Sequence, residues 1–180
     1  MRVLGLDPGS RKTGFGVVER SGNRLACVDH GTISPRGRLE LPQRLLAIAT
    51  RVGELIDRHA PDAVVIEEAF YHESVRSTLV LGHVRGALLV AALQRGVEVA
   101  EYSPRAIKLS VVGTGAATKE QVAFMVKRLL ALRATPAPDE SDALAGALCH
   151  LHHTRISAPA RAAREVARGL EALLARRGRR

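Results

Sequence analysis

The sequence contains very few aromatic residues: it has no Trp, two Tyr and three Phe among 180 residues. A hydrophobic core must therefore be built from aliphatic side chains, which is feasible because 46% of the residues are hydrophobic. One domain is expected, since single cores usually form in chains of about 50 to 200 residues. In so aromatic-poor a chain, an aromatic side chain exposed to solvent would suggest a function.

Cysteines and long apolar runs are also scarce. Cys27 and Cys149 lie far apart and form no Cys-x-x-Cys motif, which favours two buried thiols in a reducing compartment. No signal peptide is recognised at the N-terminus, and no apolar run approaches the roughly 18 residues that a membrane span needs. These absences predict a cytoplasmic protein with no membrane partner.

Acidic residues are outnumbered by basic ones, with 18 Asp and Glu against 27 Lys and Arg, for a net charge of +9. Most of the basic residues are Arg, whose planar guanidinium suits phosphate better than the point charge of Lys. The excess indicates a polyanionic partner such as nucleic acid. The alternative is a basic tail on an ordinary domain, because residues 155–180 alone contain eight Arg and two Glu.

The hydrophobic pattern predicts an α/β fold in which three strands joined by hairpins are followed by alternating helices and strands. A three-stranded meander extended by parallel crossovers gives a mixed five-stranded sheet flanked by helices, which is the ribonuclease H-like topology. We expect one nuclease-sized domain over 1–154 and a basic, Arg/Ala-rich tail over 155–180. The expected strands are 2–7, 14–20, 24–34, 63–66 and 97–102, and the expected helices are 41–59, 78–94, 104–112, 118–132 and 139–153.

Four carboxylates occupy positions that this topology could bring together. Asp7 and Glu67 end two strands that should be neighbours, at the sheet edge where open α/β folds place their sites. Asp139 and Asp142 lie in the first turn of a helix, and their spacing of three puts them on one face. Taken singly, each carboxylate has an ordinary explanation. Asp7 could be a turn residue before Pro-Gly, and Glu67 could be a solvated strand end. Asp139 and Asp142 could be favoured by the helix dipole alone.

A cluster of this kind repels itself unless a cation neutralises it. Oxygen ligands without a supporting His or Cys favour Mg²⁺, or Mn²⁺, over zinc. Two such ions about 4 Å apart can activate a water molecule and stabilise the leaving oxygen of a phosphoryl displacement. The carboxylates on a basic chain are thus compatible with a two-metal nuclease.

Several segments resemble motifs of the RuvC family of Holliday junction resolvases, and they occur in that family's order and spacing. They are Gly5 to Gly16, Ile66 to Phe70, Leu81 to Gly86, Val111 to Gly115 and Asp139 to Ala145. The resemblance implies an endodeoxyribonuclease that cuts four-way DNA junctions by paired symmetric nicks in recombination and repair. It also implies a homodimer and a link to the RuvA–RuvB branch-migration complex.

By position, the resemblance assigns the catalytic, Mg²⁺-binding carboxylates to Asp7, Glu67, Asp139 and Asp142. It places Lys108 and Lys119 near the scissile phosphate and gives Phe70 a stacking role on an unpaired base, for which core packing is the alternative. Ser74 stands where Asn is expected, which puts one backbone contact in doubt. The further residues assigned to DNA binding are Tyr71, Arg76, Arg11 and Lys12.

Other interpretations stay open. An actin-like ATPase shares the opening Gly-x-Asp-x-Gly motif but needs a second domain, for which 180 residues are too few. Another ribonuclease H-like nuclease, or a junction-binding protein without catalysis, fits the residues more closely. The helix at 78–94 is apolar nearly all round, which independently favours burial in a two-fold dimer. The cluster of His150, His152 and His153 is interpreted as a solvated helix end.

Overall fold

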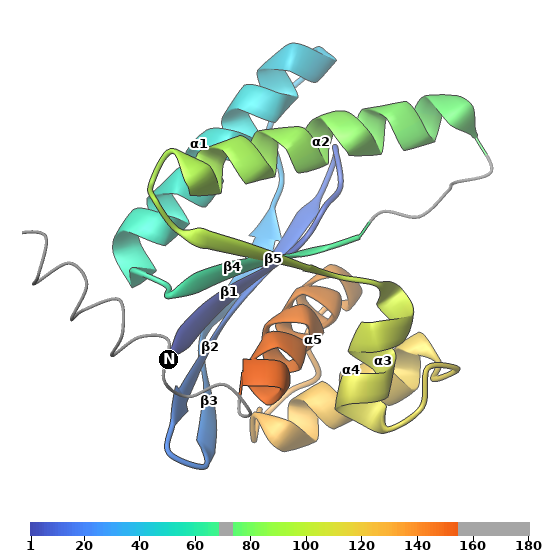
Figure 1. Ribbon diagram of the computed structural model, residues 1–180. Helices are drawn as coiled ribbons and strands as arrows, with labels where there is room; N and C mark the ends of the chain where they lie inside the picture. The colour runs from blue at the N-terminus through green and yellow to red at the C-terminus, as the bar shows by residue number, and fades with distance from the viewer. Residues whose placement is uncertain (69–73, 155–180) are drawn as a thin grey trace, which may run out of the picture.

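A computed structural model of the protein describes residues 1–68 and 74–154, and Figure 1 shows its three layers. A five-stranded sheet in the order β3-β2-β1-β4-β5 lies between two groups of helices. The predicted tail over 155–180, and Phe70 and Tyr71, lie outside the described residues. The strands are β1 (Arg2–Asp7), β2 (Thr13–Ser21), β3 (Arg24–Ile33), β4 (Ala63–Glu67) and β5 (Glu98–Tyr102).

The central strands are those with continuous apolar runs. β1 pairs with β2 antiparallel and with β4 parallel, and β4 pairs with β5 parallel, so the predicted mixed sheet is confirmed. The interior residues of β1 and β4 are buried, because helices cover both faces of the sheet there. The edge strand β3 has a more mixed sequence and leaves many of its side chains partly exposed.

Five helices complete the fold: α1 (Leu41–His59), α2 (Val75–Leu93), α3 (Pro104–Val112), α4 (Lys119–Leu129) and α5 (Pro138–His153). Helices α1 and α2 cover one face of the sheet, and α3, α4 and α5 cover the other (Figure 1). α2 begins three residues before the predicted start because the Ser74 hydroxyl caps it by accepting from the Ser77 amide. α4 ends at Leu129, before its predicted end at 132, because Ala131 adopts a positive φ. The sequence gives no sign of this end, since a positive φ is expected at glycine and not at alanine.

One expectation about the helices needs correction, and the apolar composition of α2 needs an explanation. By length and composition alone, α2 is long and apolar enough to cross a membrane, although the sequence suggested no such segment. In the fold, however, Val84 and Leu88 of α2 are fully buried in the protein core, and Arg85 pairs with Glu101 of β5. His150 is not solvated: it is buried and its Nδ1 lies 3.0 Å from the Tyr102 hydroxyl, because α5 runs along the sheet to its last turn.

The approach of α5 to the sheet is unusually close. A Cβ atom on Gly5 would lie 2.0 Å from the carbonyl oxygen of Ala143, and one on Gly14 would lie 2.0 Å from that of Asp139. Backbone therefore packs on backbone, and any side chain at either glycine would force the helix away from β1 and β2. Since Asp139 and Asp142 belong to the first turns of α5, these glycines set where both carboxylates lie.

We predict that Gly14→Ala lowers the free energy of unfolding by about 2–4 kcal/mol, as overpacking of a rigid contact does. Gly146→Ala is the matched control in α5 itself, because its Cβ would make an ordinary 3.5 Å contact with Val65. Removal of a helical glycine there should be neutral or stabilising by up to about 1 kcal/mol. Urea unfolding of the two variants measures both values, and equal stabilities would refute the close-packing argument.

Candidate active site

The sheet topology brings two acidic side chains together. Leu6 of β1 is in register with Ile66 of β4, so Asp7 and Glu67 end neighbouring parallel strands at the same edge. The turn after Asp7 is closed by the buried Thr13, whose hydroxyl donates to the Gly9 carbonyl at 2.8 Å. This hydrogen bond holds the turn that follows Asp7 against the sheet.

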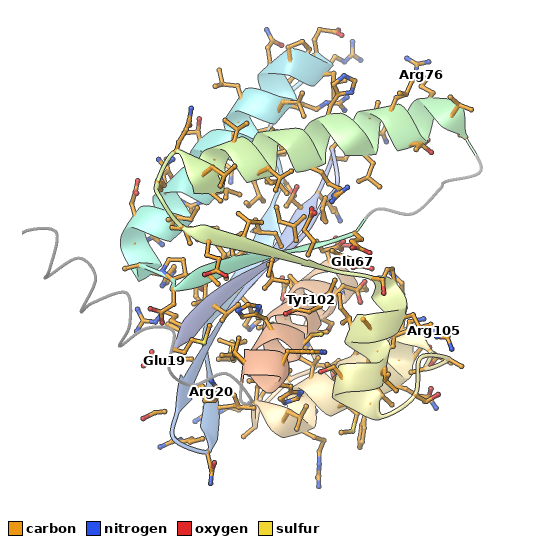
Figure 2. All side chains as sticks on the ribbon, in the orientation of Figure 1. Glu19, Arg20, Glu67, Arg76, Tyr102 and Arg105 are labelled. Atoms are coloured by element: carbon orange, nitrogen blue, oxygen red, sulfur yellow. The ribbon has the colours of Figure 1, made fainter. Side chains whose placement is uncertain are left out.

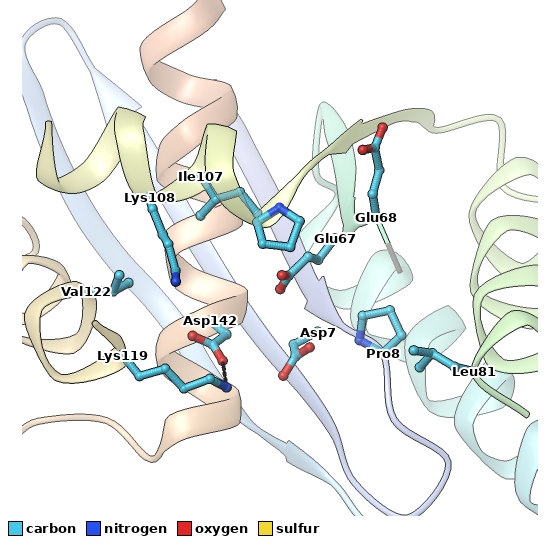
Figure 3. Close-up of a pocket in the computed structure, with 11 residues that line it drawn as sticks. Asp7, Pro8, Glu67, Glu68, Leu81, Ile107, Lys108, Lys119, Val122 and Asp142 are labelled. Atoms are coloured by element: carbon cyan, nitrogen blue, oxygen red, sulfur yellow. Dashed lines mark hydrogen bonds and ion pairs between the residues drawn. The ribbon is translucent and has the colours of Figure 1, made fainter. Parts of the chain in front are cut away.

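Helix α5 supplies the third carboxylate. Figure 3 shows Asp142 lining a cavity of about 500 Å³ together with Asp7 and Glu67, with one of its carboxylate oxygens directed at Lys119. Lys108 from α3 and Lys119 from α4 line the same cavity. Asp139, one helical turn before Asp142, does not line it, but its negative charge acts on Asp7. The fold therefore brings three of the four predicted carboxylates and both lysines to one cavity. The fourth carboxylate, Asp139, lies outside the lining but close enough for its charge to act on Asp7.

The two strand-end carboxyls are hard to ionise. Burial, followed by repulsion from Glu67, Asp142 and Asp139, raises the pKa of Asp7 from 3.8 to about 7. Burial, followed by repulsion from Asp142, raises the pKa of Glu67 from 4.5 to about 7, although Lys119 and Lys108 oppose this rise. Neither side chain accepts a hydrogen bond from any residue that the structure describes. Both groups therefore favour a proton, or a cation in its place.

Lys119 neutralises part of this charge. Its Nζ lies 2.9 Å from Oδ2 of Asp142, and this hydrogen bond is the main reason that the pKa of Lys119 is raised. The Lys119 side chain is 72% exposed, so the ion pair contributes little to stability and can exchange for another partner. Asp142 is thus available to a competing cation.

The donor set fits a hard divalent cation rather than a soft one. The cavity offers carboxylate oxygens and contains no His or Cys among its lining residues. As they stand, with Asp142 turned to Lys119, the described residues form no group of three acidic, His or Cys side chains ready to hold one ion. A cation would need to draw Asp142 from Lys119, and the weakness of that pair permits it.

Apolar side chains to which the sequence analysis assigned no role in the site form the walls of the cavity: Pro8, Leu81, Pro104, Ile107 and Val122. Glu68 also borders the cavity, but its carboxylate points away from the other three (Figure 3). Arg11 and Lys12 are exposed on the turn after β1. Arg76 lies at the start of α2, well apart from Glu67 (Figure 2). Pro8 and Leu81 lie within the family-like segments, but their place in the walls emerges only when distant elements pack.

A mixed sheet between helical layers, with carboxylates at the ends of β1 and β4 and on a crossing helix, defines a nuclease of the ribonuclease H-like fold. The sequence narrows this class further. The model of the family described as "Crossover junction endodeoxyribonuclease RuvC" matches residues 3–150. The chain therefore belongs to the RuvC family.

Individual relatives agree with this membership. A crossover junction endodeoxyribonuclease RuvC from Hyphomonas neptunium is 51% identical over 85% of this chain and 92% of its own length. A protein of the same name from Halorhodospira halophila is 47% identical over 93% and 98%. Among solved structures, Thermus thermophilus RuvC in complex with a Holliday junction substrate has a TM-score of 0.82 at 36% identity, covering 87% of this chain and 96% of that one.

Without divalent ions, we predict that thermal stability falls as the pH rises from about 5 to 8. The carboxyls of Asp7 and Glu67 ionise near 3.8 and 4.5 when unconstrained, but near 7 in the fold. Between these values the folded state holds more protons than the unfolded state, so raising the pH favours unfolding; below about pH 4 the difference disappears. After allowance for solvent screening, the cost above pH 7 is on the order of 2–4 kcal/mol.

Melting temperatures measured by calorimetry at several pH values, with and without Mg²⁺, check this prediction. Mg²⁺ should raise the melting temperature more at pH 8 than at pH 5, because protons no longer compete at the higher pH. Asp7→Asn removes one titrating group and should flatten the metal-free profile. If the melting temperature of Asp7→Asn depended on pH as that of the parent protein does, the raised pKa assigned to Asp7 would be contradicted.

Proposed function

We propose that the protein is a Mg²⁺-dependent endodeoxyribonuclease that resolves four-way DNA junctions by paired symmetric nicks, in homologous recombination and DNA repair. The observation that carries the proposal is the convergence of Asp7, Glu67 and Asp142 on one cavity with two lysines beside them. Membership of the RuvC family supports it, as does the likeness to the Thermus thermophilus RuvC complex with a Holliday junction substrate. Such a role belongs in the cytoplasm, where a bacterial chromosome lies.

The metal-binding residues in this proposal are Asp7, Glu67, Asp142 and, from the margin, Asp139. Bound there, two Mg²⁺ ions, for which Mn²⁺ could substitute, would supply an activated water and stabilise the leaving oxygen of the phosphodiester. Asp7 and Glu67, freed of their protons, then stay ionised at neutral pH.

The two lysines have separate tasks in this scheme. Lys119, once released from Asp142, is free to approach a phosphate oxygen at the mouth of the cavity. Lys108 enters from α3 on the same side of the cavity as Lys119, with Asp142 between them, and is proposed to neutralise charge that develops on the reacting phosphate. Arg11, Lys12 and Arg76 are proposed to hold more distant parts of the DNA backbone. Base stacking by Phe70, with a contact by Tyr71, rests on the sequence resemblance alone.

We predict that Glu67→Gln abolishes cleavage of a synthetic four-way junction but leaves its binding intact. The amide cannot supply the negative charge that a cation requires, and loss of several kcal/mol of transition-state stabilisation slows cleavage by about 10³-fold or more. Phosphate contacts made by Lys and Arg do not depend on Glu67. Cleavage is followed on gels with and without Mg²⁺, and binding is followed by fluorescence anisotropy in the absence of Mg²⁺.

Glu68→Gln is the matched control, because it removes the same charge from the adjacent residue, whose carboxylate points away from the cluster (Figure 3). It should cut at a rate close to that of the parent protein. Equal loss of activity in both variants would remove the distinction between the two glutamates. A parallel loss of binding in Glu67→Gln would show that the residue supports the fold or the DNA contact instead.

The proposal includes a homodimer formed through α2. Four large apolar side chains of this helix, Val75, Leu79, Val90 and Leu93, are more than half exposed. Their spacing places them along one stripe of the helix, and Gly82 and Gly86 within it would let a partner approach closely. Two-fold association would bury this stripe and present one carboxylate cluster to each of two opposed strands of a junction. Cooperation with a RuvA–RuvB complex is a further expectation from the family resemblance.

We predict that the purified protein sediments as a dimer at micromolar concentration and that Leu79→Glu shifts it to the monomer. A charge buried at an apolar interface costs several kcal/mol, which exceeds what neighbouring contacts can offset. Val28→Glu on the edge strand β3 also adds a charge at an exposed apolar position and should leave the dimer unchanged. A parent protein that is monomeric, or that nicks one strand per junction, would contradict the dimer.

A further inference from the structure

A second cavity of about 540 Å³ adjoins the candidate active site and has no assigned role. It lies between α4 and the segment that leads into α5, and Lys119 and Asp142 line both cavities. Phe124, Lys127 and Arg128 line it beyond that shared boundary. We refer to this second cavity as the α4 groove. A polymer lying across the carboxylates could continue directly into it.

Phe124 is the most unusual residue of the α4 groove. It is 60% exposed, whereas Phe15 is 8% exposed and packs in the core. Neighbouring Val122 and Val126 are buried and already anchor α4 on the domain, so the helix does not need Phe124 for packing. An exposed aromatic that contributes nothing to the core is typical of a surface on which bases stack.

The charges of the groove suit a polyanion. Three cations, Lys119, Lys127 and Arg128, line it against the single glutamate Glu120 and the shared Asp142. Lys127 and Arg128 form no ion pair with any residue in 1–68 or 74–154. A helix dipole also favours cations in the last turn of α4, but it offers no reason for an exposed aromatic between them and the active site.

We propose that the α4 groove binds the DNA strand next to the phosphate held at the carboxylates, with one base stacked on Phe124 and the backbone facing Lys127 and Arg128. This inference rests on the proposed nuclease function and extends its substrate contact. Lys127 follows Lys119 by about two helical turns, or roughly 12 Å, which spans about three base-pair steps of ~3.4 Å. The contact therefore lies within a few nucleotides of the cut.

Other occupants suit the groove less well. The segment 155–180 carries eight Arg and two Glu, so its charge has the same sign as that of the groove lining. A second copy of the chain brings a net charge of +9. A DNA strand is the polyanion that the carboxylate site must already hold, and it reaches the groove without a separate docking step.

The test uses four-way junctions that carry 2-aminopurine at single positions on either side of the mapped nick, with the full-length protein in the absence of Mg²⁺. Stacking on Phe124 should quench the fluorescence at one position, and Phe124→Ala should abolish this quenching and weaken binding by about tenfold. Phe124→Trp should retain both. Lys127→Ala should weaken binding and lower the slope of log affinity against log salt by about one.

Val28→Ala is the control, since it trims an exposed apolar side chain on β3, and it should match the parent protein in every assay. If alanine at position 124 lowers stability, Phe124→Gln offers a polar replacement for the same exposed position. Quenching and affinity that Phe124→Ala and Phe124→Gln leave unchanged would overturn the inference. A change of sedimentation instead of quenching would assign the groove to a second copy and overturn it equally.

Failure of this inference and failure of the proposed function give different results. If the parent protein cuts junctions in Mg²⁺ while the Phe124 variants bind and stack as it does, the groove inference is wrong and the nuclease stands. If the parent protein binds junctions but does not cut them, the nuclease proposal is wrong. Position-specific quenching lost in Phe124→Ala would still establish the groove as a DNA contact in that case.

Discussion

The backbone contact between α5 and the first two strands is the constraint on which the site depends. Gly5 and Gly14 allow the carbonyls of Ala143 and Asp139 to lie where a Cβ atom would otherwise be, so the helix rests directly on the sheet. The small buried residues of α5 continue along the sheet, although at Gly146 the contact is looser, since a Cβ atom there would lie an ordinary 3.5 Å from the Val65 side chain of β4. A helix displaced outward to make room for a Cβ atom would carry Asp142 away from the two strand-end carboxylates. The position of α5 therefore determines whether a site exists.

That packing has an electrostatic consequence. Burial of Asp7 and Glu67 at the sheet edge, followed by repulsion from Glu67 at Asp7 and from Asp142 at both, raises the pKa values of these two carboxyls to about 7. Lys119 relieves the charge from an exposed position and at small energetic gain. The charge cluster therefore costs the domain stability at neutral pH. In the proposed function, a cation bound by these carboxylates would offset that cost.

Much of this architecture follows from sequence pattern. The apolar run at Ala63 to Ile66 and the helical spacing of 41–59 are strong signals because periodicity reflects burial directly. The parallel pairing of β1 with β4 then places Asp7 beside Glu67 without further information. Serine is a usual N-cap residue, so Ser74 offers a sequence signal for the start of α2 at Val75. The end of α4 at Leu129 is set beside an alanine with positive φ, which no pattern encodes. The burial of His150 against Tyr102 arises from tertiary contacts alone.

Phe124 carries a signal that sequence pattern alone does not resolve. The scarcity of aromatics makes each one informative, yet helical periodicity assigns Phe124 only to the mixed face of an amphipathic helix, where core packing is the usual outcome. Its significance depends on Lys119, about a turn and a half earlier on the same helix, which lines both the carboxylate cavity and the α4 groove. In the absence of DNA, Lys119 holds Asp142; a phosphate or a cation that separates this pair frees the lysine at the boundary between the two cavities. Occupation of the carboxylate site and engagement of the neighbouring strand are therefore expected to be coupled through one exposed side chain.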